Sequence, residues 1–131
     1  MEIKKRDIKI TIVIISLFVA GMVMQSVIER LNKNKIISDY GITVGIFHDF
    51  KEVGAEGNPY LTYKYNVDGI DYFRTIMPQK KLYYCRDGKC KGKMWKVLYY
   101  KKKPKRSLID LSNEVTDSGA TYVIENFEAF E

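Results

Sequence analysis

Histidine and cysteine, which most often hold metals or act in nucleophilic catalysis, are scarce in this 131-residue chain: it has one histidine and two cysteines. His48 and a Cys-x4-Cys pair provide too few ligands for a zinc site. The sequence also lacks a Gly-x-Ser-x-Gly motif, a glycine-rich phosphate loop, a His-Glu-x-x-His motif and a paired-carboxylate signature. His48 and Asp49 are neighbours in an expected strand, so their side chains point to opposite faces. We therefore expect no enzyme, no metal, no cofactor and no small-molecule substrate.

Basic residues are absent from residues 107–131, which carry six acidic side chains: Asp110, Glu114, Asp117, Glu125, Glu128 and Glu131. Residues 80–106 show the opposite bias, with twelve basic side chains against Asp87 alone: Lys80, Lys81, Arg86, Lys89, Lys91, Lys93, Lys96, Lys101, Lys102, Lys103, Lys105 and Arg106. Two interpretations are open. The acidic end packs alongside the basic strands and offsets their repulsion, or a basic patch stays uncovered for a partner.

Charge is also absent from residues 10–28, which read ITIVIISLFVAGMVMQSVI. As a helix this run is about 28 Å long, close to the hydrocarbon thickness of a bilayer. It is longer than the core of a secretory signal peptide, although Val19-Ala20-Gly21 could serve as a poor cleavage site. We expect an uncleaved signal anchor that contacts the bilayer: a cytoplasmic N-terminus at 1–9, a transmembrane helix at 10–31 and a linker at 32–40. A cleaved signal peptide is the alternative.

The flanking charges give a small bias in orientation. Four basic residues precede the run and three follow it: Lys4, Lys5, Arg6 and Lys9, then Arg30, Lys33 and Lys35. Because positive charge is favoured on the cytoplasmic side, we expect the N-terminus inside. The protein would then be a single-pass protein of the inner (cytoplasmic) membrane, with its domain in the periplasm or outside the cell.

The segment Cys85-Arg86-Asp87-Gly88-Lys89-Cys90 gives independent support for that orientation. Asp-Gly is a preferred pair for a type I′ turn between two strands. With this turn the two cysteines face each other with Cα atoms about 4.5 Å apart, within range of a disulfide. A disulfide would require an oxidising compartment. Two reduced, buried thiols are the alternative.

The remaining sequence predicts a mainly β fold. We expect residues 41–111 to form one small antiparallel domain, a sandwich or barrel of about five to six strands. The expected strands are 42–50, 60–67, 70–76, 80–85, 94–100 and a short piece at 107–111 that follows a break at Pro104. Asp68-Gly69 is a second type I′ turn signal. Strand 94–100 should be central because both of its faces are apolar. Residues 112–131 form an acidic segment, in which 121–124 closes the sheet or belongs to a loose tail.

Three segments carry a resemblance to a known family: GITVG at 41–45, YKYNVDG at 63–69, and VLYY at 97–100 running into PKRS at 104–107. They are similar to the DUF3592 family, and more generally to small membrane-anchored bacterial envelope proteins. This chain departs from the family pattern in having one span and Lys103-Pro104 in place of asparagine-proline. The family has no established catalytic residues, so the resemblance implies no site.

We expect a non-enzymatic single-pass protein whose extracytoplasmic domain binds another protein in or at the membrane, as an accessory subunit of an envelope complex. The expected partner-binding surface joins charge to aromatic area, and consists of Tyr99, Tyr100, Lys101, Lys102, Lys103, Lys105 and Arg106. For a domain outside the cytoplasm we expect no nucleic-acid partner. Two alternatives stay open: an immunity-type protein that neutralises a toxin at the envelope, and a cytoplasm-facing binder of anionic lipid or nucleic acid.

Overall fold

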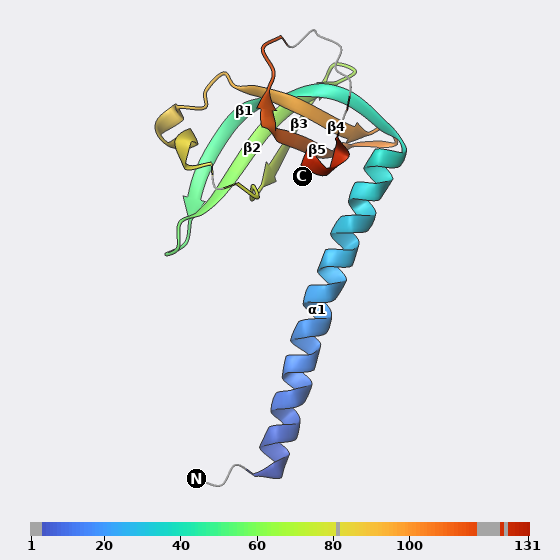
Figure 1. The fold of residues 1–131 in the computed structure, drawn as a ribbon, viewed down its shortest axis with the longest axis vertical. Helices are drawn as coiled ribbons and strands as arrows, with labels where there is room; N and C mark the ends of the chain where they lie inside the picture. Colours follow the sequence, from blue (N-terminus) through green and yellow to red (C-terminus); the bar gives the residue numbers. More distant parts are fainter. Residues whose placement is uncertain (1–3, 81, 118–123, 125) are drawn as a thin grey trace. The chain divides into compact units, whose positions relative to one another are not determined.

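The computed structural model describes residues 4–80, 82–117, 124 and 126–131, and its chain divides into two compact units, Met1–Asn34 and Lys35–Glu131. Figure 1 shows one long helix followed by a β-sheet. The elements in chain order are α1 (Lys5–Ser38), β1 (Tyr40–Val53), β2 (Asn58–Val67), β3 (Ile70–Ile76), the 3-10 helix η1 (Tyr83–Gly88), β4 (Met94–Tyr100), β5 (Lys103–Glu114) and the 3-10 helix η2 (Phe127–Ala129). The expected fold class, a long apolar helix followed by an antiparallel β domain, is confirmed.

Helix α1 includes the uncharged run and continues to Ser38. The structure therefore has helix where a linker was expected at 32–40, and β1 begins only two residues later, at Tyr40. No glycine or proline lies between residues 22 and 40 to end the helix earlier. The helix closes with a tight turn, in which the backbone N–H of Asp39 donates to the carbonyl of Ile36 at 3.2 Å.

The domain is built on one antiparallel sheet of five strands, in the order β3-β2-β1-β4-β5. The central strand is thus β1, and the expectation that residues 94–100 would be central is wrong. Strand β4 lies between β1 and β5, one place from the edge. Both faces of β4 are apolar for another reason: the main core covers one face, and a second apolar cluster covers the other.

The β2–β3 hairpin follows the sequence prediction. Asp68 and Gly69 have φ values of 52° and 84°, the left-handed conformation that a type I′ turn requires at both central residues. The side-chain oxygen of Asn66 accepts a hydrogen bond from the backbone N–H of Gly69 at 3.0 Å. Strand β3 covers residues 70–76 as expected, and β2 starts slightly earlier than expected, at Asn58.

The β4–β5 hairpin differs from the prediction, which ended a strand at Pro104. The turn lies at Lys101 and Lys102, and β5 begins at Lys103 and runs through the proline to Glu114. Proline lacks a backbone N–H, and an edge strand such as β5 tolerates that loss. The carbonyl of Pro104 is itself used, since it accepts a hydrogen bond from the hydroxyl of Tyr65 at 2.6 Å.

The main core lies on the inner face of the curled sheet. Its buried side chains come from β2 to β5 and from the segment before β4: Leu61, Tyr63, Tyr65, Val67, Ile76, Leu82, Cys85, Cys90, Trp95, Val97, Ile109 and Leu111. The two edge strands approach each other across this core, because the Nη1 atom of Arg74 in β3 donates to the carbonyl of Ser107 in β5 at 2.5 Å. The sheet is thus a partly open barrel joined at its edges by side chains.

A second cluster covers the opposite face of β4 and β5. It consists of the buried residues Ile36, Leu98, Leu108 and Phe130, with Ile37, Tyr40, Tyr100, Ile124 and Phe127 packed against them. The last residues also pair with β5: Ile109 and Glu131 exchange backbone hydrogen bonds of 2.9 and 3.0 Å. Of the closing strand expected at 121–124, residues 121–123 lie outside the described residues. In the described residues, the end of the chain pairs with β5 through one antiparallel bridge, between Asp110 and Phe130.

Candidate functional site

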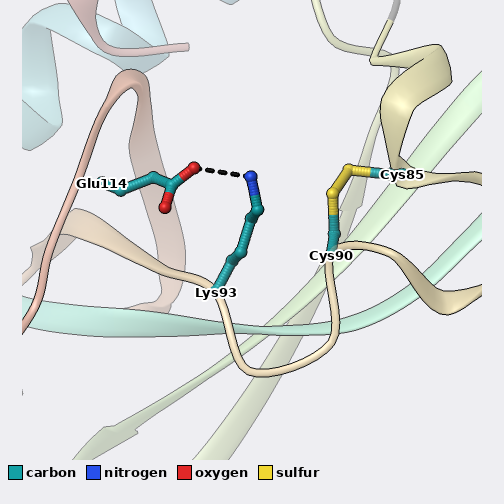
Figure 2. Close-up of a disulfide and its surroundings, with 4 residues drawn as sticks. All are labelled: Cys85, Cys90, Lys93 and Glu114. Carbon is teal, nitrogen blue, oxygen red and sulfur yellow. Dashed lines mark hydrogen bonds and ion pairs between the residues drawn. A yellow bond between two sulfur atoms is a disulfide. The ribbon is translucent and has the colours of Figure 1, made fainter.

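The structure contains the expected disulfide between Cys85 and Cys90, with Cα atoms 4.7 Å apart (Figure 2). The turn between the cysteines is also as expected, because Asp87 and Gly88 have φ values of 58° and 72°. The flanking strands are not present. Residues 83–88 form η1, and residues 89–92 are turns. Of the strand expected at 80–85, residue 81 lies outside the described residues, and residues 82–85 are not in a strand, so the cross-strand character of the disulfide is wrong.

Both disulfide cysteines are buried in the main core beside Leu82 and Trp95. A buried disulfide is poorly accessible to attacking thiolates. Its contribution is therefore structural: it closes residues 85–90 on themselves, and the buried cystine packs in the main core. We call residues 83–93 the disulfide loop.

Two ion pairs attach the disulfide loop to the sheet. Arg86 in the loop binds Glu52 of β1 through two hydrogen bonds, and its guanidinium lies 4.5 Å from the centre of the Tyr83 ring. The hydrogen bond with Arg86 lowers the pKa of Glu52, and the same contact raises the pKa of Arg86. The side chains of Arg86 and Glu52 therefore hold the disulfide loop against β1.

The second ion pair joins Lys93 to Glu114 at the end of β5, with 2.6 Å between Nζ and Oε1 (Figure 2). The hydrogen bond with Glu114 raises the pKa of Lys93. The Lys93 ammonium also lies 4.9 Å from the centre of the Tyr84 ring. Glu114 belongs to the acidic segment 107–131, so one acid of that segment offsets one charge of the basic segment.

The lysines at the turn between β4 and β5 take no part in these two ion pairs. Lys101 and Lys102 form the turn between β4 and β5, and Lys103 and Lys105 follow in β5; all four side chains are exposed. Within the part of the chain that the structure describes, none of these four lysines forms an ion pair. We call them the hairpin-tip lysines. The backbone N–H of Lys101 donates to the carbonyl of Asp39 at 3.1 Å, so the tip is fixed next to the residue that separates α1 from β1.

The two tyrosines of the expected site lie on opposite faces of the sheet. Tyr99 packs against the main core and covers Gly41, where an added Cβ would be 2.2 Å from its ring. Tyr100 packs in the second cluster with Ile36 and Leu98. The structure therefore brings the hairpin-tip lysines together, but it does not place both rings beside them on one surface. Arg106 is half-buried, unlike these lysines.

The outer face of the sheet has an uncovered area that was not predicted from the sequence. Ile42 and Ile46 of β1 and Phe73 of β3 are 38%, 37% and 51% exposed, although they lie in regular strands. Ile46 is in register with Lys64, and Lys64 with Phe73, so these three side chains form one row across β1, β2 and β3. The ring of His48 lies against Phe73, with centroids 4.9 Å apart. We call Ile42, Ile46, Phe73, His48 and Lys64 the outer-face patch.

No protein-family model, curated protein or solved structure matches this chain. The resemblance to the DUF3592 family thus stays a prediction.

Among residues 4–80, 82–117, 124 and 126–131, no group of three or more histidine, cysteine, aspartate or glutamate residues is arranged to hold a metal ion. The buried hydroxyl of Tyr63 has its pKa raised by burial, but it is hydrogen-bonded to Ser107 and Arg74. Helix α1 is long and apolar enough to cross a membrane.

Proposed function

We propose that this chain is a non-enzymatic, single-pass membrane protein whose extracytoplasmic β domain binds another protein, as an accessory subunit of a complex in the cytoplasmic membrane. The uncharged run in α1 supports the anchor. The disulfide supports a domain outside the cytoplasm, because disulfides persist in oxidising compartments. The proposal includes a location in the cytoplasmic membrane, with the N-terminus inside and the β domain outside the cytoplasm.

The outer-face patch is the observation that carries protein binding. Among the described residues, the second cluster covers the outer face of the sheet at β4, where Leu98 is fully buried with Ile36 and Phe130. Ile42 is in register with Leu98 on the neighbouring strand, yet it is exposed. The patch therefore continues an apolar interface that is already formed inside the domain. Neighbouring exposed apolar side chains on one face are typical of an interaction surface.

The chemistry of the patch indicates what its partner presents. Lys64 stands between Ile46 and Phe73 in the same cross-strand row, so a positive charge interrupts the apolar surface. A complementary partner surface is apolar with a carboxylate opposite Lys64. Since the domain follows α1 directly, we expect this partner to be a membrane protein or to lie at the membrane surface.

The test uses the full-length chain, cross-linked in native membranes, purified in mild detergent and examined by mass spectrometry. Phe73→Arg places a charge in the patch, and we expect it to remove a partner that co-purifies in fixed stoichiometry with the unaltered chain. Ile70→Arg is the matched control, because Ile70 is similarly exposed and lies on the same strand outside the Ile46–Phe73 row. We expect this control to keep the partner.

Two results would contradict the proposed surface. If Phe73→Arg retains the partner while its thermal unfolding matches that of the unaltered chain, the patch does not bind it. If replacing Lys101, Lys102 and Lys103 with glutamate removes the partner and Phe73→Arg does not, the hairpin-tip lysines form the protein-binding surface instead.

A further inference from the structure

We propose that the hairpin-tip lysines bind the anionic phosphate headgroups of the leaflet from which the C-terminal end of α1 emerges. This inference rests on the membrane anchor of the proposed function, but it adds a second contact, with lipid, at a surface separate from the outer-face patch. It requires neither a particular orientation of α1 nor a protein partner.

The hairpin-tip lysines differ from Arg86 and Lys93 in having no carboxylate partner among the described residues. Arg86 and Lys93 come from the same basic segment, and each binds a carboxylate, Glu52 and Glu114 respectively. The hairpin-tip lysines instead project into solvent, with no ion pair to any acid in the described part of the chain. Three of them are consecutive in sequence and the fourth follows after Pro104. Consecutive charges of one sign repel one another, and a partner of opposite charge relieves that repulsion.

The residue that holds the hairpin tip follows the uncharged run closely along the chain. The uncharged run ends at Ile28, and Asp39, whose carbonyl binds the backbone of Lys101, follows eleven residues later. As helix, those eleven residues rise about 16 Å. The headgroup layer takes up about 5–7 Å of that rise. The length of the chain therefore limits Asp39 to at most about 10 Å beyond the headgroup layer, which is close to the Debye length of about 8–10 Å at physiological salt.

Lysine is a side chain suited to phosphate headgroups. Lysine presents a compact, strongly hydrated charge on a flexible stem and binds phosphate as a point charge. Clusters of such residues directly next to a membrane span are a recognised form of attraction to anionic lipid. The rings of Tyr99 and Tyr100 are packed against the two apolar clusters, which leaves charge as the main feature that the tip offers to a partner.

The chain supplies a matched control in Lys89 and Lys91. Both are exposed and lie in the disulfide loop, before β4 begins, whereas the tip follows the end of β4. The seven residues of β4 put about 23 Å between the two positions. Charge reversal at Lys89 and Lys91 therefore changes the net charge as much as reversal at Lys101 and Lys102, at a different place in the domain.

The experiment measures amide hydrogen exchange in residues 99–106 of the full-length chain, reconstituted in nanodiscs. One set of discs contains phosphatidylcholine alone, and the other contains phosphatidylcholine mixed with phosphatidylglycerol. We expect exchange in this segment to be several-fold slower in the anionic discs, and the difference to disappear at high salt. K101E/K102E should abolish the difference, and K89E/K91E should keep it.

Three outcomes would overturn the inference: equal exchange in both kinds of disc, loss of the difference in K89E/K91E as well as in K101E/K102E, or the same slowing in phosphatidylcholine discs when inorganic phosphate is added. The last outcome would identify a site for the free anion. Each is distinct from failure of the proposed function, which is decided by partner retention in Phe73→Arg.

Discussion

The hydroxyl of Tyr63 lies 2.7 Å from the hydroxyl of Ser107, although the two residues are 44 positions apart. Tyr63 is in β2 and Ser107 is in β5, and both β1 and β4 separate these strands in the sheet. The hydrogen bond therefore crosses the inside of the curled sheet. Arg74 in the edge strand β3 joins it, since its Nη1 atom donates to the Tyr63 hydroxyl at 3.3 Å and to the Ser107 carbonyl at 2.5 Å.

Replacing Tyr63 with phenylalanine should destabilise the domain by about 1–2 kcal/mol, because the buried Ser107 hydroxyl loses its partner while the apolar packing of the ring is kept. Urea unfolding of the full-length chain in mild detergent measures this loss. Tyr60→Phe is the control, since Tyr60 lies on the same strand with its side chain on the other face. Equal midpoints for Tyr63→Phe and the unaltered chain would show that the hydrogen bond adds nothing to stability.

Stability should also fall at high pH. Burial raises the pKa of Tyr63 above its ordinary value of 10.0, with Arg74 and Ser107 acting in the opposite direction. Above about pH 10 the unfolded chain releases a proton that folded Tyr63 retains. The contribution of this group is therefore complete below pH 10 and is lost as pH rises through the folded-state pKa.

We expect the urea midpoint to stay level up to about pH 9 and then decline, with a smaller decline in Tyr63→Phe. Absorbance of tyrosinate, followed in the same samples, locates the titration. A decline of equal size in both proteins would assign the alkaline transition to other groups, such as Tyr65, whose pKa is also raised mainly by burial.

Removing the disulfide with Cys85→Ala and Cys90→Ala should lower stability by about 2 kcal/mol, the entropy expected for closing a six-residue loop. Reductant should destabilise the unaltered chain similarly and leave the double variant unchanged. Both cysteines should resist alkylation in the native protein until reductant is added. A reactive thiol in the untreated protein would contradict the disulfide and remove its support for an extracytoplasmic domain.

The two Asp-Gly turns show where sequence reasoning succeeds and where it stops. Asp68-Gly69 and Asp87-Gly88 both adopt the positive φ values that were predicted, because the preference is local to the two residues. Whether the residues on either side of a turn pair as strands depends on other parts of the chain as well. Gly92 has a φ of 85°, which interrupts any extended run after the second turn. The disulfide thus holds a loop where the turn signal alone indicated a hairpin.

Which side chains on the outer face of the sheet are buried could not be predicted from the alternation of apolar and polar residues alone. Ile42 and Leu98 are cross-strand partners with similar side chains, yet Leu98 is fully buried and Ile42 is exposed. The difference comes from Ile36 and Phe130, which approach from distant parts of the sequence and pack with Leu98 of β4 and Leu108 of β5. The same interior packing explains why β4 is apolar on both faces without being central.

The expected partner-binding surface at residues 99–106 stays a prediction, but its geometry can be compared with the sequence. Charge counting located the hairpin-tip lysines, which the structure leaves exposed. Placing Tyr99 and Tyr100 on the same surface ignored the two-residue period of a strand, which puts consecutive side chains on opposite faces. Because both tyrosines belong to one expected strand, that period by itself separates the two rings.

Gly45 offers a further test of the sheet, because no side chain fits at its position in β1. An added Cβ would lie 2.6 Å from Cγ2 of Val97 and 3.2 Å from Cδ2 of Tyr63. Valine has restricted side-chain rotation, and Val97 is fully buried, so it cannot turn away. We expect Gly45→Ala to cost about 1–3 kcal/mol of stability in urea unfolding.

Gly21→Ala is the control, because no heavy atom lies within 4 Å of the Cβ it would add and alanine favours a helix. It should leave unfolding of the β domain unchanged. If Gly45→Ala were as stable as the unaltered chain, β1 could not lie this close to Val97. The β1–β4 pairing that exposes Ile42 and Ile46 beside the buried Leu98 would then be wrong, and the outer-face patch would be wrong with it.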